Sequence, residues 1–320
     1  MIRTVFFGTP DFAVTCLEAL VAAPDVVVCA VVTAPDRPSG RGQSIQPAPV
    51  ARAAEAQGIP VLRPERLRDE VFLAELRAVN ADVFTVVAFR MLPEVVWSMP
   101  PLGSLNIHGS LLPDLRGAAP IQWSLAHGDP QTGLTAFSLN AHIDEGPILD
   151  LVTLNVGPNE TLGSLYPRMA VAGAELAVRV LAELGRNGLK LRPQPDATEH
   201  RLAPKLGPEF AQLELQNSSL AVHNRIRACD PMPGASLPSP EHNGARFKLF
   251  ASDYWPTAPQ SPEGELCYTI DNEHIKVVDA HGTSVIHEVQ WPGKRRMPTA
   301  EFLRGSRIRG RFTLSGQKID

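Results

Sequence analysis

Residues 5–32 read VFFGTPDFAVTCLEALVAAPDVVVCAVV, and their pattern sets the fold that we expect for the first half of the chain. A short apolar run stops at Gly8, residues 12–22 have a helical composition, and residues 26–32 are apolar and largely β-branched. Strands that are apolar along their full length and separated by helices are typical of a parallel sheet covered on both faces. The stretch therefore predicts an α/β domain.

The same alternation continues to about residue 185. Residues 104–108 have the length and composition of a buried strand, and Leu165, Leu176 and Leu184 share one face of a long helix that we expect to end at Gly185. Further helices are expected over residues 49–57, 71–79 and 120–127, and further strands over residues 59–62, 82–88, 135–139 and 148–154. We therefore predict one α/β domain with a mostly parallel sheet over residues 1–189.

The pattern changes after this helix. Residues 190–208 contain four prolines and no sustained periodicity, which favours an interdomain linker. Beyond it, short β-type runs are separated by glycines, prolines and acidic residues, as in a small barrel or sandwich. These runs cover residues 247–250, 266–270, 274–278, 283–289 and 312–314. A second, β-rich domain is therefore expected over residues 209–320.

Composition and charge narrow the class of protein. With 44% hydrophobic and 20% charged residues among 320, the chain resembles an ordinary globular protein, so disordered and coiled-coil classes are disfavoured. The formal net charge is −4, yet residues 290–318 hold eight basic side chains against Glu301 alone. A basic stripe on a small β-barrel is typical of a surface that follows a phosphate backbone, and the alternative is a solvated face.

Cysteines and apolar runs indicate the compartment. The four cysteines are far apart and include no Cys-x-x-Cys pair, which argues against a zinc knuckle or a disulfide scaffold. The N-terminus lacks the apolar region of a signal peptide, and residues 26–32 are too few to cross a bilayer. We expect a soluble, cytoplasmic protein with no membrane partner.

The turn after the first strand argues against nucleotide cofactors. Dinucleotide-binding folds place Gly-x-Gly-x-x-Gly there, whereas this chain has only Gly8 and then Pro10, which lacks a backbone donor. The sequence contains no Gly-x-x-x-x-Gly-Lys-Ser/Thr motif either. NAD, FAD and phosphate-loop chemistry are therefore disfavoured.

The candidate chemistry lies in the strand over residues 104–108. Asn106 and His108 lie two residues apart, so their side chains point to the same side at the carboxyl end of the strand, where open α/β sheets bind ligands. An amide can donate to a developing oxyanion, and an imidazole can move a proton near neutral pH. Asp144 lies in a loop between two predicted strands and can orient the ring. A metal site of His108, His142 and Asp144 is the alternative.

A resemblance to a known family supports the catalytic interpretation. The run from Asn106 to Pro113, continued by residues 116–120, resembles the signature of the 10-formyltetrahydrofolate-dependent formyltransferases. Residues 8–13 and 35–42 resemble the branch of that superfamily that acts on initiator tRNA, and so do residues 203–205, 226–235 and 293–297. The resemblance spans nearly the whole chain. It implies a Rossmann-like formyltransferase domain followed by a small OB-like β-barrel domain that binds tRNA.

The resemblance also implies a reaction and its residues. A formyl group would pass from 10-formyltetrahydrofolate, the co-substrate, to the α-amine of methionyl initiator tRNA for translation initiation, without a metal. Asn106 would donate to the oxyanion, His108 would move a proton and Asp144 would hold the imidazole ring. The turn that would contact folate consists of Ser110, Leu111, Leu112 and Pro113. Tetrahydrofolate would leave as the product.

Basic residues complete the implied site. In the family, the loop that carries Arg37 and Arg41 enters the acceptor stem of the tRNA, where a weak end pair is easily opened. The basic tail, residues 290–318, would bind tRNA through Lys294, Arg295 and Arg296. The resemblance further implies a monomeric enzyme.

Several positions depart from the family pattern. Arg90 follows Phe89 where a glycine is usual, Ala51 stands where a lysine is frequent, and Met232 replaces an aromatic residue. None of them removes a group that the chemistry requires. The alternatives are a formyltransferase for an amino sugar or a purine precursor, hydrolysis of formyl-folate by water, and a non-catalytic RNA-binding protein on the same fold. A purine-type enzyme does not need residues 209–320, and a sugar enzyme should lack the loop around Arg41.

Overall fold

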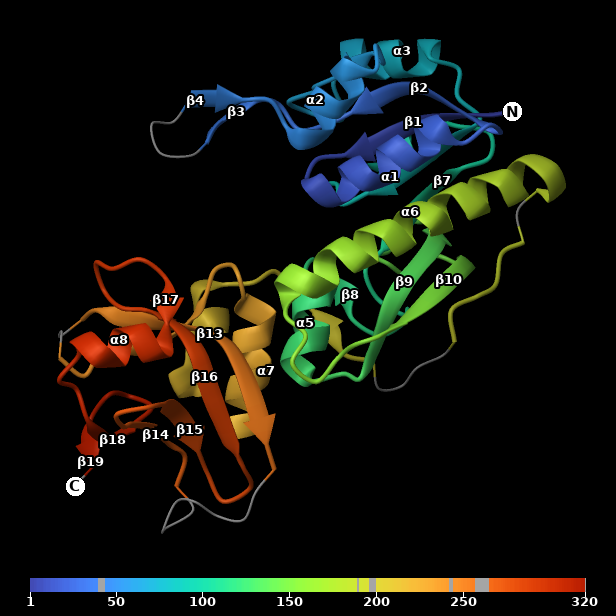
Figure 1. Cartoon of the computed structure of the whole chain (residues 1–320). Helices are drawn as coiled ribbons and strands as arrows, with labels where there is room; N and C mark the ends of the chain where they lie inside the picture. Colours follow the sequence, from blue (N-terminus) through green and yellow to red (C-terminus); the bar gives the residue numbers. More distant parts are fainter. Residues whose placement is uncertain (40–43, 189, 196–199, 242–243, 257–264, 320) are drawn as a thin grey trace. The chain divides into compact units, whose positions relative to one another are not determined.

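The computed structural model describes residues 1–39, 44–188, 190–195, 200–241, 244–256 and 265–319 (Figure 1). Their contacts form two compact units. Unit 1 consists of Met1–Gly117, Thr132–Leu154 and Tyr166–Ala203, and unit 2 consists of Ala118–Gln131, Asn155–Leu165 and Pro204–Asp320. Two segments from within the predicted residues 1–189 therefore pack in unit 2, so the contacts do not follow a single boundary in the sequence.

Unit 1 is built on a seven-stranded sheet with the strand order β10-β9-β7-β6-β1-β2-β5. The pairs β1–β2, β1–β6, β2–β5 and β6–β7 are parallel, and β9 runs antiparallel to β7. The strands are β1 (Ile2–Gly8), β2 (Val26–Val32), β5 (Val61–Leu62), β6 (Val83–Val87), β7 (Ser104–His108), β9 (Gln131–Ser138) and β10 (Ile148–Asn155). The predicted, mostly parallel sheet is confirmed.

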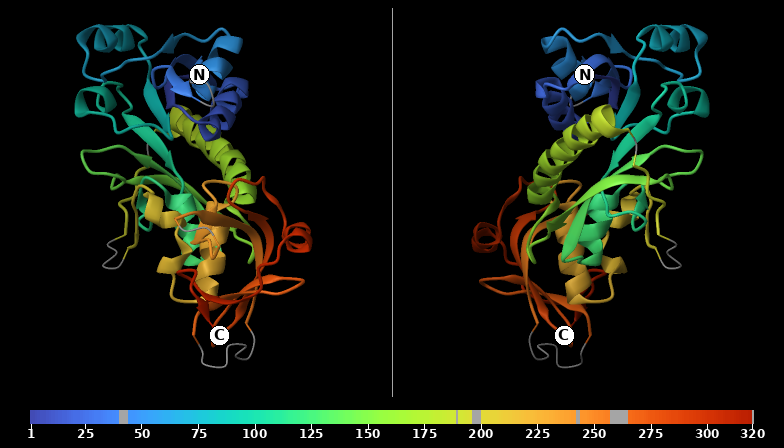
Figure 2. Two further views of the ribbon diagram at one scale, coloured as in Figure 1. Left: turned by 90° about the vertical axis from the view of Figure 1, so that its left-hand side faces the viewer. Right: turned by 90° about the vertical axis from the view of Figure 1, so that its right-hand side faces the viewer.

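Helices cover both faces of this sheet. On one face lie α1 (Asp11–Ala22) and α6 (Leu162–Asn187) (Figure 2). The rings of Phe12 in α1 and Tyr166 in α6 are 5.3 Å apart between centroids. On the other face, a cluster of buried side chains joins Phe7 and Phe84 to α3 (Glu70–Ala78) and α4 (Glu94–Trp97). The remaining elements of unit 1 are α2 (Pro49–Ala56), the hairpin of β3 (Arg37–Ser39) and β4 (Ser44–Gln46), and the parallel pair of β8 (Arg116–Gly117) and β11 (Leu202–Ala203).

Unit 2 contains an antiparallel half-barrel with the strand order β12-β13-β16-β15-β14-β18-β19, and β17 pairs with β16. A Cβ atom at Gly316 would lie 3.3 Å from the carbonyl oxygen of Pro238, so the two ends of the sheet approach each other. The strands are β12 (Ala235–Pro238), β13 (Arg246–Trp255), β14 (Cys267–Ile270), β15 (Ile275–Val278), β16 (Thr283–Gln290), β17 (Met297–Pro298), β18 (Gly310–Thr313) and β19 (Lys318–Ile319). The predicted fold class is therefore confirmed for this part too.

The helices of unit 2 are α5 (Pro120–His127), α7 (Ser219–Cys229) and α8 (Thr299–Gly305), with two short 3₁₀ turns over Pro208–Ala211 and Leu213–Leu215. Neither α7 nor α8 was expected from the sequence. Helix α7 was not predicted because its buried side chains include His223, Asn224 and Arg227. They interrupt the apolar stripe by which an amphipathic helix is recognised. None of the helices in the described ranges is long and apolar enough to span a membrane.

Candidate active site

Strand β7 positions the first two candidate residues. It lies between β6 and β9, with Asn106 in register with Val86 on one side and Phe137 on the other. The side chain of Ile107 points toward α6, since a Cβ atom at Gly173 would lie 3.6 Å from it. Because side chains alternate along a strand, Asn106 and His108 project from the opposite face, as predicted.

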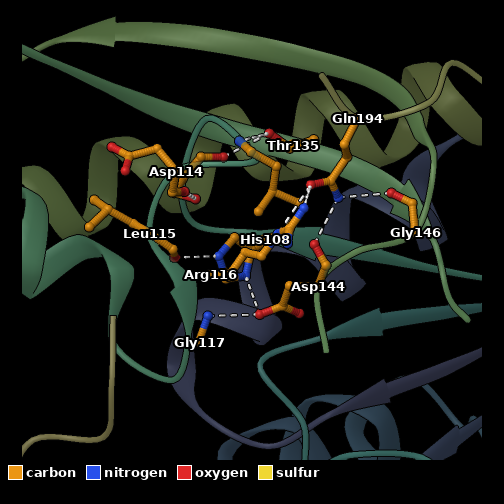
Figure 3. Close-up of polar contacts among 11 residues, drawn as sticks. His108, Asp114, Leu115, Arg116, Gly117, Thr135, Asp144, Gly146 and Gln194 are labelled. Atoms are coloured by element: carbon orange, nitrogen blue, oxygen red, sulfur yellow. Dashed lines mark hydrogen bonds and ion pairs between the residues drawn. The ribbon is translucent and has the colours of Figure 1, made fainter. Parts of the chain in front are cut away.

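His108 is held between two groups of unit 1. Its Nε2 lies 3.0 Å from the carbonyl oxygen of Leu115, and its Nδ1 lies 3.7 Å from Oδ2 of Asp144 (Figure 3). A carbonyl oxygen only accepts, so the hydrogen on Nε2 is donated to Leu115 and Nδ1 faces the carboxylate. The side chain of His108 is only 6% exposed. The ring is thus oriented by protein groups before any substrate binds.

Asp144 reaches this position through an unusual backbone. Its φ angle is +55°, and its Oδ2 accepts a 2.9 Å hydrogen bond from the backbone N–H of Gly117. Gly117 has a φ of +124°, and a Cβ atom there would lie 2.5 Å from the carbonyl oxygen of Ala203. At Gly146, a Cβ atom would lie 1.6 Å from the carbonyl oxygen of Ser138. Only glycine allows both close approaches, so the Asp144-Glu145-Gly146 sequence has a steric basis.

Gln194 completes the cluster and was not found from the sequence. Its Nε2 donates to the carbonyl oxygens of Asp144 (2.7 Å) and Gly146 (2.9 Å), and its Oε1 accepts from Nη2 of Arg116 at 2.6 Å (Figure 3). Arg116 also forms an ion pair with Glu145 at 3.1 Å. No local pattern marks Gln194, because it lies 50 residues from Asp144 in a proline-rich segment. Only the tertiary structure brings it to the site.

The turn predicted to contact folate follows β7 directly. The hydroxyl of Ser110 is turned inward, where it donates to the carbonyl oxygen of Asp114 at 2.6 Å. Leu112 is also buried, whereas Leu111 and Pro113 are half-buried. Thr135 of β9 holds the turn from below, since its hydroxyl donates to the carbonyl oxygen of Ser110 and accepts from the N–H of Leu112. The turn therefore presents apolar side chains on a framework of internal hydrogen bonds.

Arg90, which departs from the family pattern, is exposed but anchored. Its guanidinium donates to the carbonyl oxygens of Pro64 and Glu65 and lies over the ring of Phe89. This charge is therefore tied to the segment after β5 rather than extended into solvent.

The predicted tRNA-binding residues lie in two stretches of the sequence, one with Arg37 and Arg41 and the other in the basic tail of unit 2. Arg37 is the first residue of β3, and Arg41 lies outside the described residues. Lys294 is exposed, and Arg295 is exposed and lies 3.2 Å from Glu301.

Arg296 is held by more contacts than Lys294 and Arg295. It forms ion pairs with Glu288 and with the buried Asp230, and it stacks over the ring of Phe250 at 4.1 Å. Hydrogen bonds from Arg296 to a buried carboxylate identify it as part of the framework of unit 2.

The metal alternative receives no support. Within the described ranges, no group of three histidine, cysteine, aspartate or glutamate side chains is arranged to hold a metal ion, and His142 is exposed. The Asn106–His108–Asp144 arrangement instead combines an amide donor, a buried imidazole and a carboxylate beside one strand. Such a set suits the transfer of an acyl-type group to an amine.

Comparison with known families agrees with this chemistry. A family model described as formyl transferase matches residues 2–181, and one described as formyl transferase, C-terminal domain, matches residues 205–307. The chain therefore belongs to the formyl transferase family. The predicted family membership and the predicted class of enzyme, a transferase of formyl groups, are confirmed.

Curated relatives refine the position of the chain within the family. The methionyl-tRNA formyltransferase of Thermobifida fusca is 42% identical over 308 residues, which cover 96% of this chain and 97% of that protein. The enzyme of the same name from Alcanivorax borkumensis is 41% identical over 307 residues, covering 95% and 92%. That from Bacteroides thetaiotaomicron is 40% identical over 312 residues, covering 96% of each. The similarity thus extends over both family domains.

Solved structures share the fold at lower identity. The N-formyltransferase from Helicobacter canadensis, in complex with folinic acid and dTDP-3-aminofucose, is 18% identical with a TM-score of 0.63, covering 93% of this chain and 100% of that one. The glycinamide ribonucleotide transformylase 1 of Symbiobacterium toebii is 20% identical with a TM-score of 0.50, covering 61% of this chain and 95% of that one. The second neighbour matches a smaller part of the chain.

The hydroxyl of Thr135 is predicted to stabilise the turn over residues 110–113. Thr135→Val keeps the shape of the side chain but leaves the N–H of Leu112 and the carbonyl of Ser110 without this partner, which should lower the free energy of unfolding by about 1–3 kcal/mol. Urea unfolding measures the loss. Thr135→Ser, which keeps the hydroxyl, is the matched control and should lose less. A larger loss in Thr135→Ser than in Thr135→Val would show that the methyl group, not the hydroxyl, matters.

Proposed function

We propose that this chain transfers the formyl group of 10-formyltetrahydrofolate to the α-amino group of methionyl initiator tRNA. The observation that carries the proposal is the alignment with methionyl-tRNA formyltransferases at 40–42% identity, over at least 92% of each protein. The alignment includes the C-terminal family domain over residues 205–307. The proposal includes a monomeric enzyme that acts in the cytoplasm.

Asn106 is the proposed donor to the developing oxyanion. When an amine attacks the planar formyl carbon, that carbon becomes tetrahedral and negative charge gathers on its oxygen. The side chain of Asn106 is partly exposed on the face that carries His108, and within the described structure its amide makes no hydrogen bond. An amide in this state offers its N–H groups to a substrate oxygen without first breaking an internal contact.

His108 is proposed to transfer the proton, and Asp144 is proposed to stabilise the protonated imidazole ring. The attacking amine must lose a proton and the departing N10 of folate must gain one, so one buried imidazole beside both atoms can serve the transfer. Asp144 lies 3.7 Å from Nδ1 of His108, which is longer than a hydrogen bond. A proton that arrives on Nδ1 is stabilised by this carboxylate, and the ring keeps its orientation through Leu115.

The folate is proposed to lie against the turn after β7. Leu111 and Pro113 are half-buried and offer apolar surface to a flat ring system. Ser110 and Leu112 support this surface from the interior, since both side chains are buried. In this proposal, only two of the four predicted folate residues touch the ligand through their side chains.

The tRNA is proposed to contact two basic regions. One is the hairpin of β3 and β4 with Arg37 and Arg41, as the family resemblance implies. The other is the basic tail of unit 2, where the exposed Lys294 and Arg295 are the residues suited to phosphate contact. Arg296 is assigned to packing instead, because its guanidinium already pairs with Asp230 and Glu288.

An amine-acceptor assay tests the proposed function. The enzyme and 10-formyltetrahydrofolate are incubated in three separate reactions, with methionyl initiator tRNA, with a nucleotide-linked amino sugar, or with buffer alone. Formyl transfer and folate release are measured in each. Rapid formylation of the tRNA alone supports the proposal. Preferential formylation of the amino sugar would make this a sugar enzyme, and equal folate release in buffer would make it a hydrolase.

Removal of the Asn106 amide is predicted to affect turnover and not folate affinity. Asn106→Ala should lower kcat by about 10²–10³-fold, because the amide acts only when charge develops on the formyl oxygen. Steady-state kinetics gives kcat, and calorimetric titration gives the folate Kd. Asn106→Asp, which keeps the size but removes both N–H donors, should lose at least as much. Parallel losses in kcat and folate affinity would instead make Asn106 a residue that positions substrate.

Neutralising the exposed part of the basic tail is predicted to weaken tRNA binding. Lys294→Ala combined with Arg295→Ala should raise KM for tRNA and leave kcat unchanged. The slope of log affinity against log salt should fall by about 1 for each phosphate that the variant no longer neutralises. Arg296→Ala is the contrasting variant, which should lower Tm because Asp230 stays buried without its partner. An unchanged salt slope in the double variant would place this surface away from the RNA.

A further inference from the structure

The segment that follows α6 is anchored to the framework of unit 1 at both ends. Near its beginning, Arg192 forms two backbone hydrogen bonds with Ile148 of β10, at 2.7 and 2.9 Å. At its end, β11 (Leu202–Ala203) pairs in parallel with β8, which carries Arg116 and Gly117. The described parts of this segment, residues 190–195 and 200–203, are called the strap below. Sequence periodicity predicted only an interdomain linker here.

The strap contacts the loop that carries Asp144. The amide of Gln194 donates to the backbone carbonyls on both sides of Glu145, those of Asp144 at 2.7 Å and Gly146 at 2.9 Å. Its oxygen accepts from Nε and Nη2 of Arg116, at 3.2 and 2.6 Å. Gln194 thus ties the loop to the same strand, β8, whose Gly117 donates to the carboxylate of Asp144.

The strap also contacts the other partner of His108. The backbone carbonyl of Arg201 accepts a 2.7 Å hydrogen bond from the N–H of Leu115, whose own carbonyl accepts from His108. The Arg201 side chain pairs with Asp114, and its backbone N–H donates to the same carboxylate at 2.8 Å. Although burial opposes ionisation of Asp114, the hydrogen bonds from Arg201 outweigh it and hold the pKa of this carboxyl below its usual value. Both polar groups that face the imidazole ring, on Leu115 and Asp144, are therefore held by residues of the strap.

We propose that Gln194 is a positioning residue of the transfer reaction, which acts by holding Asp144 against His108. The inference rests on the proposed function for its kinetic consequence but not for its geometry. Asp144 has a φ of +55°, a conformation that is unfavourable for a residue with a side chain and needs support from its surroundings. The two hydrogen bonds from Gln194 supply this support at the carbonyls of Asp144 and Gly146.

Gln194→Glu is the most informative substitution. It keeps the size of the side chain and an acceptor for Arg116, but it replaces both N–H donors with a carboxylate that faces two carbonyl oxygens. The loop should then shift away from His108. A misplacement of about 1 Å at a catalytic group lowers turnover by about 10²-fold, so we expect a loss of that size in kcat with KM for folate and tRNA nearly unchanged.

Three controls separate positioning from general damage. Gln57→Glu makes the same chemical change at an exposed site of unit 1 and should leave kcat unchanged. Gln194→Met, uncharged and similar in size, should also lower kcat if the donors matter. It replaces Gln194→Glu as the test variant if Gln194→Glu folds poorly. In an Asp144→Asn background, Gln194→Glu should lower kcat little further, because the residue through which it acts is already disabled.

A crystal structure of Gln194→Glu gives a readout that needs no substrate. A carboxylate of Asp144 that leaves the N–H of Gly117, together with the loss in kcat, supports the proposal. Wild-type turnover in both Gln194 variants would overturn it, and so would an unmoved Asp144 or independent, multiplicative losses in the double variant. If the wild-type enzyme formylates no tRNA, the proposed function fails, while the position of Asp144 in the variant still decides the role of Gln194.

Discussion

Strand β7 lies where the pairing of the central sheet changes from parallel to antiparallel, and the site depends on this position. Its parallel neighbour β6 and its antiparallel neighbour β9 fix both edges, so the alternation of side chains along it cannot slip by one residue without exposing Ile107 and burying Asn106. On the β9 side, His108 stands in register with Thr135, whose hydroxyl holds the turn after the strand. One strand register therefore sets the amide, the imidazole and the ligand-facing turn together.

Backbone groups supply much of the organisation around His108. The ring donates to the carbonyl of Leu115, and Asp144 accepts from the N–H of Gly117, so the partner in each contact is a backbone group. Leu115, Gly117 and Asp144 all have positive φ angles, which turn these groups inward. For Leu115 and Asp144, which carry side chains, such conformations are unfavourable in isolation and persist where the surroundings hold them. The pairing of β8 with β11 and the hydrogen bonds of Gln194 provide that support.

Unit 2 uses buried polar groups in a different way. His223 is 1% exposed, and burial lowers its pKa to about 4, so the ring is neutral at physiological pH. In this state it can donate from Nε2 to the carbonyl of Pro158 and accept at Nδ1 from the hydroxyl of Ser252. Burial also lowers the pKa of Arg227 to about 10, yet its guanidinium remains charged and donates to the carbonyls of Gly157 and Glu160. Hydrogen bonds thus join α7 to the segment before α6.

Local patterns determined those parts of the protein whose stability comes from periodic burial. Strands β2 and β7 and helix α5 have the predicted bounds, and the two-residue period of a strand already placed Asn106 and His108 on one face. Asp144 was a candidate from its loop between two predicted strands, and the structure brings it to within 3.7 Å of His108. Helix α7 escaped prediction because its buried face carries His223, Asn224 and Arg227, whose partners lie elsewhere in the chain. Gln194 escaped for the same reason, since a hydrogen bond across 50 residues leaves no periodic trace in the sequence. Periodicity reports which side of an element is buried, whereas the partner of a buried polar group is decided only when distant segments pack together.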